Sequence, residues 1–400
     1  MNLSTLEIFW VDYDSLIIST GSSPAILPIP GAKEFLARGL HVVAKPEDAM
    51  ELKEAALKGK RAVVVGGGAI GLEIAIALKE LGLDVYVTKR SPPPFPRNLD
   101  ADMGEIVRRY LESKGLRILF GKKIERIIGS DQVESVEIDG EIIQTDIVVM
   151  AVGGTPESGL AVEAGIAHNN GAIITNERME TSVEDVYAIG DCVLSFSGVD
   201  NKPVQTALAT TTFREAVVAG INAAGGEMVY DGCIGTFVSC VGDLEIASTG
   251  YNSRIAEKNG FKLVTGRANM QIKPAWMPGA KEISVKLVVD SESGRILGGQ
   301  AVGEEGAAWR VNIVALAIKT KMSIEEFRTI ELAYCPAVSN LYDPLLVAAD
   351  TAFKRFNRKR MIDYSKRIRE ERMAETPVVQ RTTATTVDVK GDSKHIPSVK

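Results

Sequence analysis

The clearest pattern of hydrophobic and polar positions lies between residues 61 and 90. An apolar run at 62–65 predicts a buried strand, and apolar residues at helical spacing from Leu72 to Leu81 predict a helix. A second apolar run, at 85–88, predicts another strand. The six residues GGGAIG, at 66–71, separate the first strand from the helix. This order of strand, glycine turn, helix and strand predicts a βαβ unit of a parallel sheet.

The glycine turn carries the spacing GxGxxG in Gly66, Gly68 and Gly71. In dinucleotide-binding folds the first glycine allows a tight turn, the second lets the backbone approach a pyrophosphate, and the third lets the helix pack close to the strand. Free N–H groups at the helix start then face the phosphates. The motif alone is weak, but the flanking strand and helix favour a dinucleotide site over a chance cluster of glycines.

The second strand of this unit ends in two cations, Lys89 and Arg90. A site for NAD has an Asp or Glu here that binds the ribose hydroxyls, whereas cations suit the 2′-phosphate of NADP. We therefore expect NADPH to be preferred over NADH. The alternative is that both residues are solvated surface side chains.

Other hydrophobic runs predict elements on both sides of this unit. A strand at 16–19 stops at Thr20 and Gly21, and a strand at 186–189 leads to Gly190 and Asp191. Ligands lie at the carboxyl ends of strands in open α/β sheets, so Asp191 is a candidate to bind a ribityl or ribose hydroxyl. Read alone, Gly190-Asp191 is a plain turn. Further runs predict helices at 47–57, 103–114 and 207–223, a strand at 116–119, and strands at 133–153 around the turn Asp139-Gly140.

The last third of the chain changes character. Strand patterns dominate from 232 to 303, and helical patterns follow at 309–321, 323–329 and 341–353. Strands followed by helices predict an α+β domain. Residues 354–373 are rich in Lys and Arg and predict a solvated helix, and we expect the polar end of the chain behind them to be disordered.

Composition narrows the function classes. With 400 residues, 45% of them hydrophobic, and a net charge of −6, the chain is globular and offers no argument for nucleic acid or an anionic membrane as partner. No apolar run approaches the roughly 20 residues of a membrane helix, and the first residues lack a basic signal start, so we expect a cytoplasmic protein. The four cysteines and three histidines are too scattered to predict disulfides or a metal site.

Four motifs in register resemble the flavin-dependent pyridine nucleotide–disulfide oxidoreductases, in the branch of coenzyme A disulfide reductases, NADH oxidases and persulfide reductases. They are YDSLIISTGS at 13–22, RAVVVGGGAIGLE at 61–73, TSVEDVYAIGDC at 181–192 and ELAYCPAVSNLYDPLLVAA at 331–349. The resemblance implies FAD and NAD(P)H as cofactors, a homodimer, and a small disulfide or sulfur substrate, with coenzyme A as one possible carrier. It also implies a Rossmann-like NAD(P) domain inserted in a partial Rossmann-like FAD domain, with an α+β dimerisation domain at the C-terminus.

The resemblance also assigns roles to residues. It implies that Thr20, Gly21, Gly190 and Asp191 lie near the flavin. It implies that Ile70, Gly71 and Glu73 line the nicotinamide site, closed by Gly153. Tyr334 matches a tyrosine that points into the partner's active site in the family, although a tyrosine packed at a dimer interface is an equal alternative. Cys335 is a candidate redox thiol, but we favour a small buried cysteine in a turn.

Two features of the family are missing. No second GxGxxG precedes Thr20, and no cysteine takes the place of the family's redox-active one. We therefore expect an oxidoreductase with less than a full flavin site, which a separate chain could complete. The alternatives are a non-catalytic nucleotide-binding remnant and a reductase of a rubredoxin- or ferredoxin-like carrier. The expected domains are a remnant of the first FAD segment (1–33), a linker helix (34–57), the NAD(P) domain (58–155), the second FAD segment (156–230), the dimerisation domain (231–353) and a basic helix with its tail (354–400).

Overall fold

The computed structural model describes residues 4, 5 and 7–375. The chain divides into two units, Met1–Asn357 and Arg358–Lys400, and the elements of the first unit are described below. The disorder expected behind the basic segment falls at 376–400, outside the described residues. No helix among the described residues is long and apolar enough to cross a membrane.

The predicted βαβ unit forms the middle of a five-stranded sheet of order β3-β10-β4-β5-β6, in which every neighbouring pair is parallel. Ala62–Val65 are buried because helices α1, α2 and α3 cover one face of the sheet, while an inserted antiparallel sheet and the segment 26–43 cover the other. Leu72, Ala75 and Leu78 of the helix after the glycine turn face the same core. The bounds are β3 Leu40–His41, α1 Pro46–Lys58, β4 Arg61–Val65, α2 Ala69–Glu80, β5 Asp84–Lys89, α3 Ala101–Ser113, β6 Arg117–Phe120 and β10 Ile147–Met150.

A three-stranded antiparallel sheet is inserted between β6 and β10. It consists of β7 (Ile124–Gly129), β8 (Val133–Ile138) and β9 (Glu141–Gln144). The predicted turn joins β8 to β9, with positive φ at both Asp139 and Gly140. The sequence placed Ile147–Met150 among these strands, but the four residues are all buried and form β10 of the parallel sheet.

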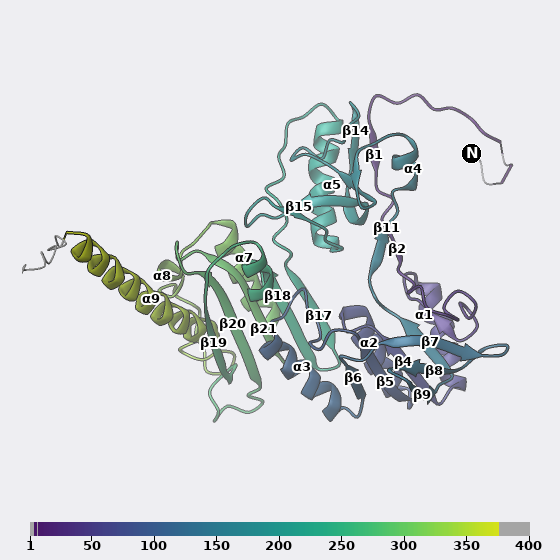
Figure 1. Ribbon diagram of the computed structural model, residues 1–400, viewed down its shortest axis with the longest axis horizontal. Helices are drawn as coiled ribbons and strands as arrows, with labels where there is room; N and C mark the ends of the chain where they lie inside the picture. The colour runs from purple at the N-terminus through teal and green to yellow at the C-terminus, as the bar shows by residue number, and fades with distance from the viewer. Residues whose placement is uncertain (1–3, 6, 376–400) are drawn as a thin grey trace, which may run out of the picture. The chain divides into compact units, whose positions relative to one another are not determined.

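The segments predicted at 16–19 and 186–189 form a parallel pair, β1 (Leu16–Ile18) and β14 (Val186–Ala188). Helix α5 (Ala209–Ala223) contacts both strands, as Figure 1 shows. Short strands and turns complete this part of the chain: β2 Ser22–Pro24, β11 Gly154–Pro156, α4 Gly159–Glu163, β12 His168–Asn169, β13 Ala172–Ile174, the 3-10 turn η1 Gly190–Cys192, β15 Val193–Phe196 and β16 Pro203–Val204.

The C-terminal part is the predicted α+β domain. Its five antiparallel strands lie side by side in the order β17-β18-β21-β20-β19 (Figure 1). The last helix is one continuous element that begins at Pro344, because Pro is favoured in the first helical turn and the Asp343 carboxylate accepts the N–H of Leu345 at 2.8 Å. The bounds are β17 Phe237–Val241, β18 Leu244–Gly250, α6 Ser253–Lys258, β19 Leu263–Gln271, β20 Glu282–Asp290, β21 Ile296–Gly303, α7 Ala307–Lys319, α8 Ile324–Phe327 and α9 Pro344–Glu375.

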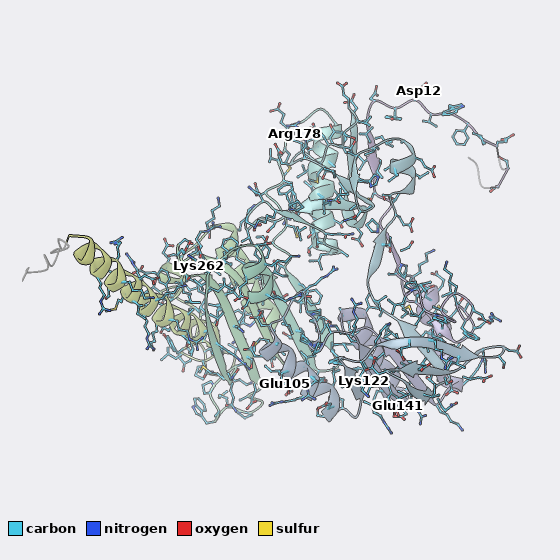
Figure 2. The ribbon with its side chains drawn as sticks, viewed as in Figure 1. Asp12, Glu105, Lys122, Glu141, Arg178 and Lys262 are labelled. Atoms are coloured by element: carbon cyan, nitrogen blue, oxygen red, sulfur yellow. The ribbon has the colours of Figure 1, made fainter. Side chains whose placement is uncertain are left out.

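The parallel sheet domain and the C-terminal sheet share a core within the first unit. Val241, Leu244 and Ile246 of the C-terminal strands belong to the same buried cluster as the residues of α2 and α3. Charged side chains cover the outside of the parallel sheet domain, such as the ion pair of Lys122 and Glu141 with 3.7 Å between Nζ and Oε2 (Figure 2). Because of the shared core, helix α2 contacts strands β4 and β5 of the parallel sheet and strand β17 of the C-terminal sheet.

Candidate functional site

Two of the fingerprint glycines are required by the backbone. Gly66 has φ of +143°, and a Cβ there would lie 2.1 Å from the carbonyl oxygen of Ala151. A Cβ on Gly71 would lie 2.9 Å from the carbonyl oxygen of Gly66. Only glycine fits at Gly66, and only a very small residue fits at Gly71, because strand β4 turns directly into helix α2 beside β10.

Gly68 differs from these two. It is the N-cap of α2 with extended φ and ψ of −98° and −171°, and a Cβ there would meet no atom within 4 Å. No side chain caps the helix. The first N–H groups of α2 therefore have no side-chain partner and lie beside open space. The fold itself would tolerate a side chain at Gly68, so folding does not explain the glycine there. This is the geometry of a site for the pyrophosphate of a dinucleotide.

Lys89 at the end of β5 lies against the glycine turn. A Cβ on Gly67 would come within 2.5 Å of the Lys89 Cδ, and the Lys89 ammonium donates to the carbonyl oxygen of Ser91 at 3.0 Å and to its hydroxyl. Burial lowers the pKa of Lys89, and the positive charge of Arg254 lowers it further. Arg90 is exposed. The sequence thus predicted a cation beside the turn but gave no sign of Arg254.

The residues proposed for the nicotinamide lie around the same turn. Ile70 is 54% exposed at the start of α2. Glu73, one turn further, accepts a hydrogen bond from the Ser239 hydroxyl of β17 at 2.6 Å. Gly153, with φ of +110°, follows β10. Since β10 and β4 are parallel neighbours, their carboxyl ends place Gly153 at the same sheet edge as Gly66.

The second set of candidates gathers at the carboxyl ends of β1 and β14. These strands are parallel partners, so Thr20 and Gly21 end beside Gly190 and Asp191. The Ser22 hydroxyl donates to the Asp191 carboxylate at 2.9 Å, and the Thr20 hydroxyl donates to the carbonyl oxygen of Glu157. Ser22 and Asp191, 169 positions apart in sequence, are therefore brought together.

A buried carboxyl group forms a hydrogen bond with the backbone at this edge. The Glu215 side chain, 1% exposed on α5, accepts the backbone N–H of Gly190 at 2.9 Å. Burial raises the pKa of Glu215, and the hydrogen bond from Gly190 opposes that rise. The hydroxyl of Thr206, just before α5, is buried and has no hydrogen-bond partner among the described residues. The Asp191 carboxylate at the carboxyl ends of these parallel strands fits the hydroxyl-bearing chain of a flavin cofactor.

Tyr334 and Cys335 lie in an irregular segment before α9. Tyr334 is 47% exposed. The expectation that Cys335 is buried is wrong: its side chain is exposed, because residues 330–343 form neither helix nor strand and lie on the outside of the domain. All four cysteines are free. No cluster of His, Cys, Asp and Glu among the described residues has the arrangement of a metal site.

Three residues of this geometry were missed by the sequence reasoning: Ser239, Glu215 and Arg254. Ser239 and Glu73 are 166 positions apart, and no local pattern connects them. Glu215 is the exception, because a carboxylate within the apolar pattern of the helix predicted at 207–223 is itself a signal of a buried polar contact.

Comparison with known proteins agrees with this geometry. The family model "Pyridine nucleotide-disulphide oxidoreductase" matches residues 7–219, and that family's dimerisation domain matches residues 236–343. An NADH oxidase of Methanocaldococcus jannaschii is 39% identical over 353 residues, which are 88% of this chain and 78% of the relative. A CoA-dependent NAD(P)H sulfur oxidoreductase of Pyrococcus abyssi is 34% identical, over 84% of this chain and 75% of the relative.

Solved structures give the same result. The NAD-dependent persulfide reductase of A. fulgidus superposes with a TM-score of 0.83 at 34% identity, over 87% of this chain. The reduced CoADR-RHD of Bacillus anthracis superposes with a TM-score of 0.83 at 29% identity, over 89% of this chain. The chain spans 65% and 64% of these two structures, slightly less than two thirds of each.

Proposed function

Because the chain belongs to the pyridine nucleotide-disulphide oxidoreductase family, whose members depend on FAD and NAD(P)H, we propose that it oxidises NAD(P)H and reduces a disulfide, a persulfide or polysulfide, or O₂. The observation that carries the proposal is the glycine turn of β4 and α2. Only glycine fits the backbone at Gly66, whereas the space around Gly68 is empty and the N-terminus of α2 has no side-chain cap.

Each residue of the turn has a separate task in this proposal. The N–H groups at the start of α2 bind the pyrophosphate, and Gly68 lets the phosphates approach the backbone. Glu73 and Gly153 line the space for the nicotinamide, and Ser239 holds the Glu73 carboxylate at 2.6 Å so that it keeps one orientation. These residues fix where the reactive end of the dinucleotide lies.

The edge of β1 and β14 is the proposed flavin site. Asp191 accepts hydroxyl groups of the flavin chain there, Thr20 and Gly21 lie close to it, and Glu215 keeps the Gly190 backbone in its positive-φ conformation. When bound, FAD carries electrons from the nicotinamide to the acceptor, and the protein aligns the two. The fit is partial, since the residues of this chain provide the end of such a site but no second glycine turn for the FAD pyrophosphate.

The open edge of β1 supports the proposal of a further flavin segment. Among the described residues β1 pairs only with β14, and Leu16 and Ile17 are each 39% exposed. An apolar parallel strand is normally covered and paired on both sides. We propose that a further strand with its own glycine turn pairs here, either on the same polypeptide or on a separate chain.

We also propose a homodimer. The C-terminal part matches the family's dimerisation domain, and its irregular segment before α9 exposes several large apolar side chains that a partner would cover: Tyr334, Val338, Leu341 and Tyr342. In such a dimer Tyr334 reaches the partner's active site or packs at the interface. The names of the relatives support two kinds of electron acceptor, a small sulfur compound, for which coenzyme A is one carrier, and O₂. A cytoplasmic location stays a prediction.

Two alternatives remain, a non-catalytic nucleotide-binding protein and a reductase of a small electron carrier. Exposed basic residues of the second unit, such as Arg358 and Arg360, favour the second of them, because an acidic carrier would be attracted there.

The test is a purified protein incubated with FAD and freed of the excess. A yellow protein that oxidises NAD(P)H with coenzyme A disulfide or polysulfide supports the enzyme. A colourless protein that still binds NAD(P)H supports the non-catalytic alternative, and activity found only with an acidic carrier supports the third function.

A further inference from the structure

The loop between β5 and α3 closes over the glycine turn. The backbone N–H of Phe95 donates to the carbonyl oxygen of Gly67 at 2.8 Å, and the Phe95 side chain is 2% exposed. Lys89 enters this loop with its Cδ against Gly67. The loop therefore lies beside the proposed dinucleotide site, at the end of β5 where the adenosine ribose of a bound dinucleotide is expected.

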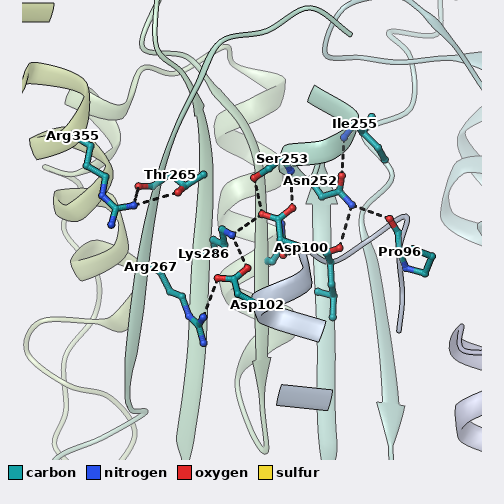
Figure 3. A network of polar contacts seen from close by, with 12 residues as sticks. Pro96, Asp100, Asp102, Asn252, Ser253, Ile255, Thr265, Arg267, Lys286 and Arg355 are labelled. Atoms are coloured by element: carbon teal, nitrogen blue, oxygen red, sulfur yellow. Dashed lines mark hydrogen bonds and ion pairs between the residues drawn. The ribbon is translucent and has the colours of Figure 1, made fainter. Parts of the chain in front are cut away.

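A helix from the C-terminal domain is fixed to the same loop. Asn252, the N-cap of α6, donates to the carbonyl oxygens of Pro96 at 3.1 Å and Leu99 at 3.3 Å. The Asp100 carboxylate accepts both the backbone N–H and the hydroxyl of Ser253, at 2.8 and 2.7 Å. Figure 3 shows these bonds meeting at the start of α6. The position of α6 relative to the loop is thus set by several hydrogen bonds of buried groups.

The acidic residues of this network are already neutralised. Lys286 binds Asp100 at 2.8 Å and Asp102 at 2.7 Å, and Arg267 binds Asp102 at 2.9 Å (Figure 3). Their negative charges are therefore balanced locally, so the loop is left with the positive charge of its own cations.

Arg254 follows Ser253 and brings one more cation to this loop. Its Nη2 donates to the carbonyl oxygen of Pro96 at 2.9 Å, and the guanidinium is exposed. Arg254 is also close enough to Lys89 for its charge to act on that ammonium. A guanidinium has five N–H donors, and this hydrogen bond uses one of them. The Lys89 ammonium, with three donors, already binds two oxygens of Ser91.

We propose that Arg254 forms, together with Lys89 and Arg90, a binding site for the 2′-phosphate of NADPH. Arg254 is then a specificity-determining residue supplied to the nucleotide domain by the C-terminal domain. The inference rests on the proposed binding of a dinucleotide at the glycine turn. A planar guanidinium with free donors binds phosphate oxygens in pairs, and neighbouring cations at neutral pH are most stable when an anion lies between them.

The variant for the test is Arg254→Gln, which removes the charge but keeps an amide N–H for the Pro96 carbonyl oxygen. Lys258→Gln is the matched control, since it removes one charge from the exposed far end of the same helix. Arg254→Lys restores the charge without the planar fork. Thermal unfolding of all three proteins checks that the loop remains folded.

The readout is calorimetric binding of adenosine 2′,5′-bisphosphate and of ADP, which needs neither flavin nor hydride transfer. Wild type is expected to bind the 2′,5′-bisphosphate more tightly than Arg254→Gln by about tenfold, with ADP affinity the same in both. Lys258→Gln should match wild type, and Arg254→Lys should lie in between.

If Arg254→Gln loses affinity equally for both ligands, Arg254 only holds the loop in place. If it loses affinity for neither, Arg254 lies outside the site. Either result overturns the inference. Wild type that binds ADP and the 2′,5′-bisphosphate equally well also overturns it, while leaving the dinucleotide site intact. Wild type that binds neither ligand overturns the dinucleotide site as well.

Discussion

Replacing Gly68 separates binding from folding more cleanly than any other change in the glycine turn. Its φ and ψ are extended, so any residue can adopt them, and a Cβ would find no atom within 4 Å. At Gly66 the opposite holds, since φ is +143° and a Cβ would lie 2.1 Å from the Ala151 carbonyl oxygen. Gly68→Val should therefore weaken dinucleotide binding with little effect on folding, whereas Gly66→Ala should destabilise the fold.

The magnitudes follow from these two environments. Gly68→Val loses a little N-cap stability and gains a little from the restricted unfolded chain, so the free energy of unfolding should change by less than about 1 kcal/mol. Gly66→Ala combines a glycine-only conformation with a backbone clash, which costs about 3 kcal/mol or more. For binding, the valine side chain of Gly68→Val fills the space of the phosphates, and we expect at least a tenfold loss of NADPH affinity, about 1.4 kcal/mol.

The assay is urea unfolding of each variant, followed by titration of the folded proteins with NADPH through the fluorescence of its reduced ring. Gly68→Ala, with a smaller side chain, should fall between wild type and Gly68→Val in affinity. If Gly68→Val binds NADPH within twofold of wild type, the pyrophosphate does not lie at the start of α2 and the reasoning is refuted.

Three further predictions concern stability and thiol chemistry. Asp343→Asn should lower the free energy of unfolding by about 3–5 kcal/mol in urea, because Asp343 and Arg310 form a buried bidentate pair at 2.9 and 2.7 Å; a change near zero would contradict it. Burial raises the pKa of Glu215 above its ordinary value of 4.5, so its contribution to stability is complete below that pH and is lost as the pH rises through the folded-state pKa. Glu215→Gln should therefore gain stability relative to wild type as the pH rises from 4.5 to 8, and parallel pH profiles would argue against it. Cys335→Ala should keep full reductase activity, since no other cysteine pairs with Cys335; loss of turnover in a folded variant would restore the redox role.

The sequence predicted best those elements whose pattern is local. Strand β4, the glycine turn and helix α2 appear where their patterns predict them, because a buried strand, three glycines and a helical apolar face are all visible within 20 residues. The family resemblance implied that the residues after β1 and after β14 lie near one flavin, but the parallel pairing of the two strands was not predicted.

The errors have physical reasons. Ile147–Met150 follows a hairpin in sequence but pairs with β4, and a run of four apolar residues fits a strand buried on both faces better than an alternating one. Cys335 was expected to be buried from residue type alone, which ignores that its segment, without helix or strand, is mostly exposed. Contacts such as Ser239 with Glu73 and Arg254 with the β5–α3 loop join residues more than 150 positions apart, and one sequence holds no signal for them.

The central claim is that a dinucleotide bound at the glycine turn reduces a flavin bound at the edge of β1 and β14. The most direct measurement mixes the FAD-loaded protein with one equivalent of NADPH in the absence of oxygen and follows the visible flavin absorbance. The account predicts that the absorbance bleaches within the time of mixing in wild type and slowly or not at all in Gly68→Val. Flavin that stays oxidised in wild type while NADPH is bound would contradict it.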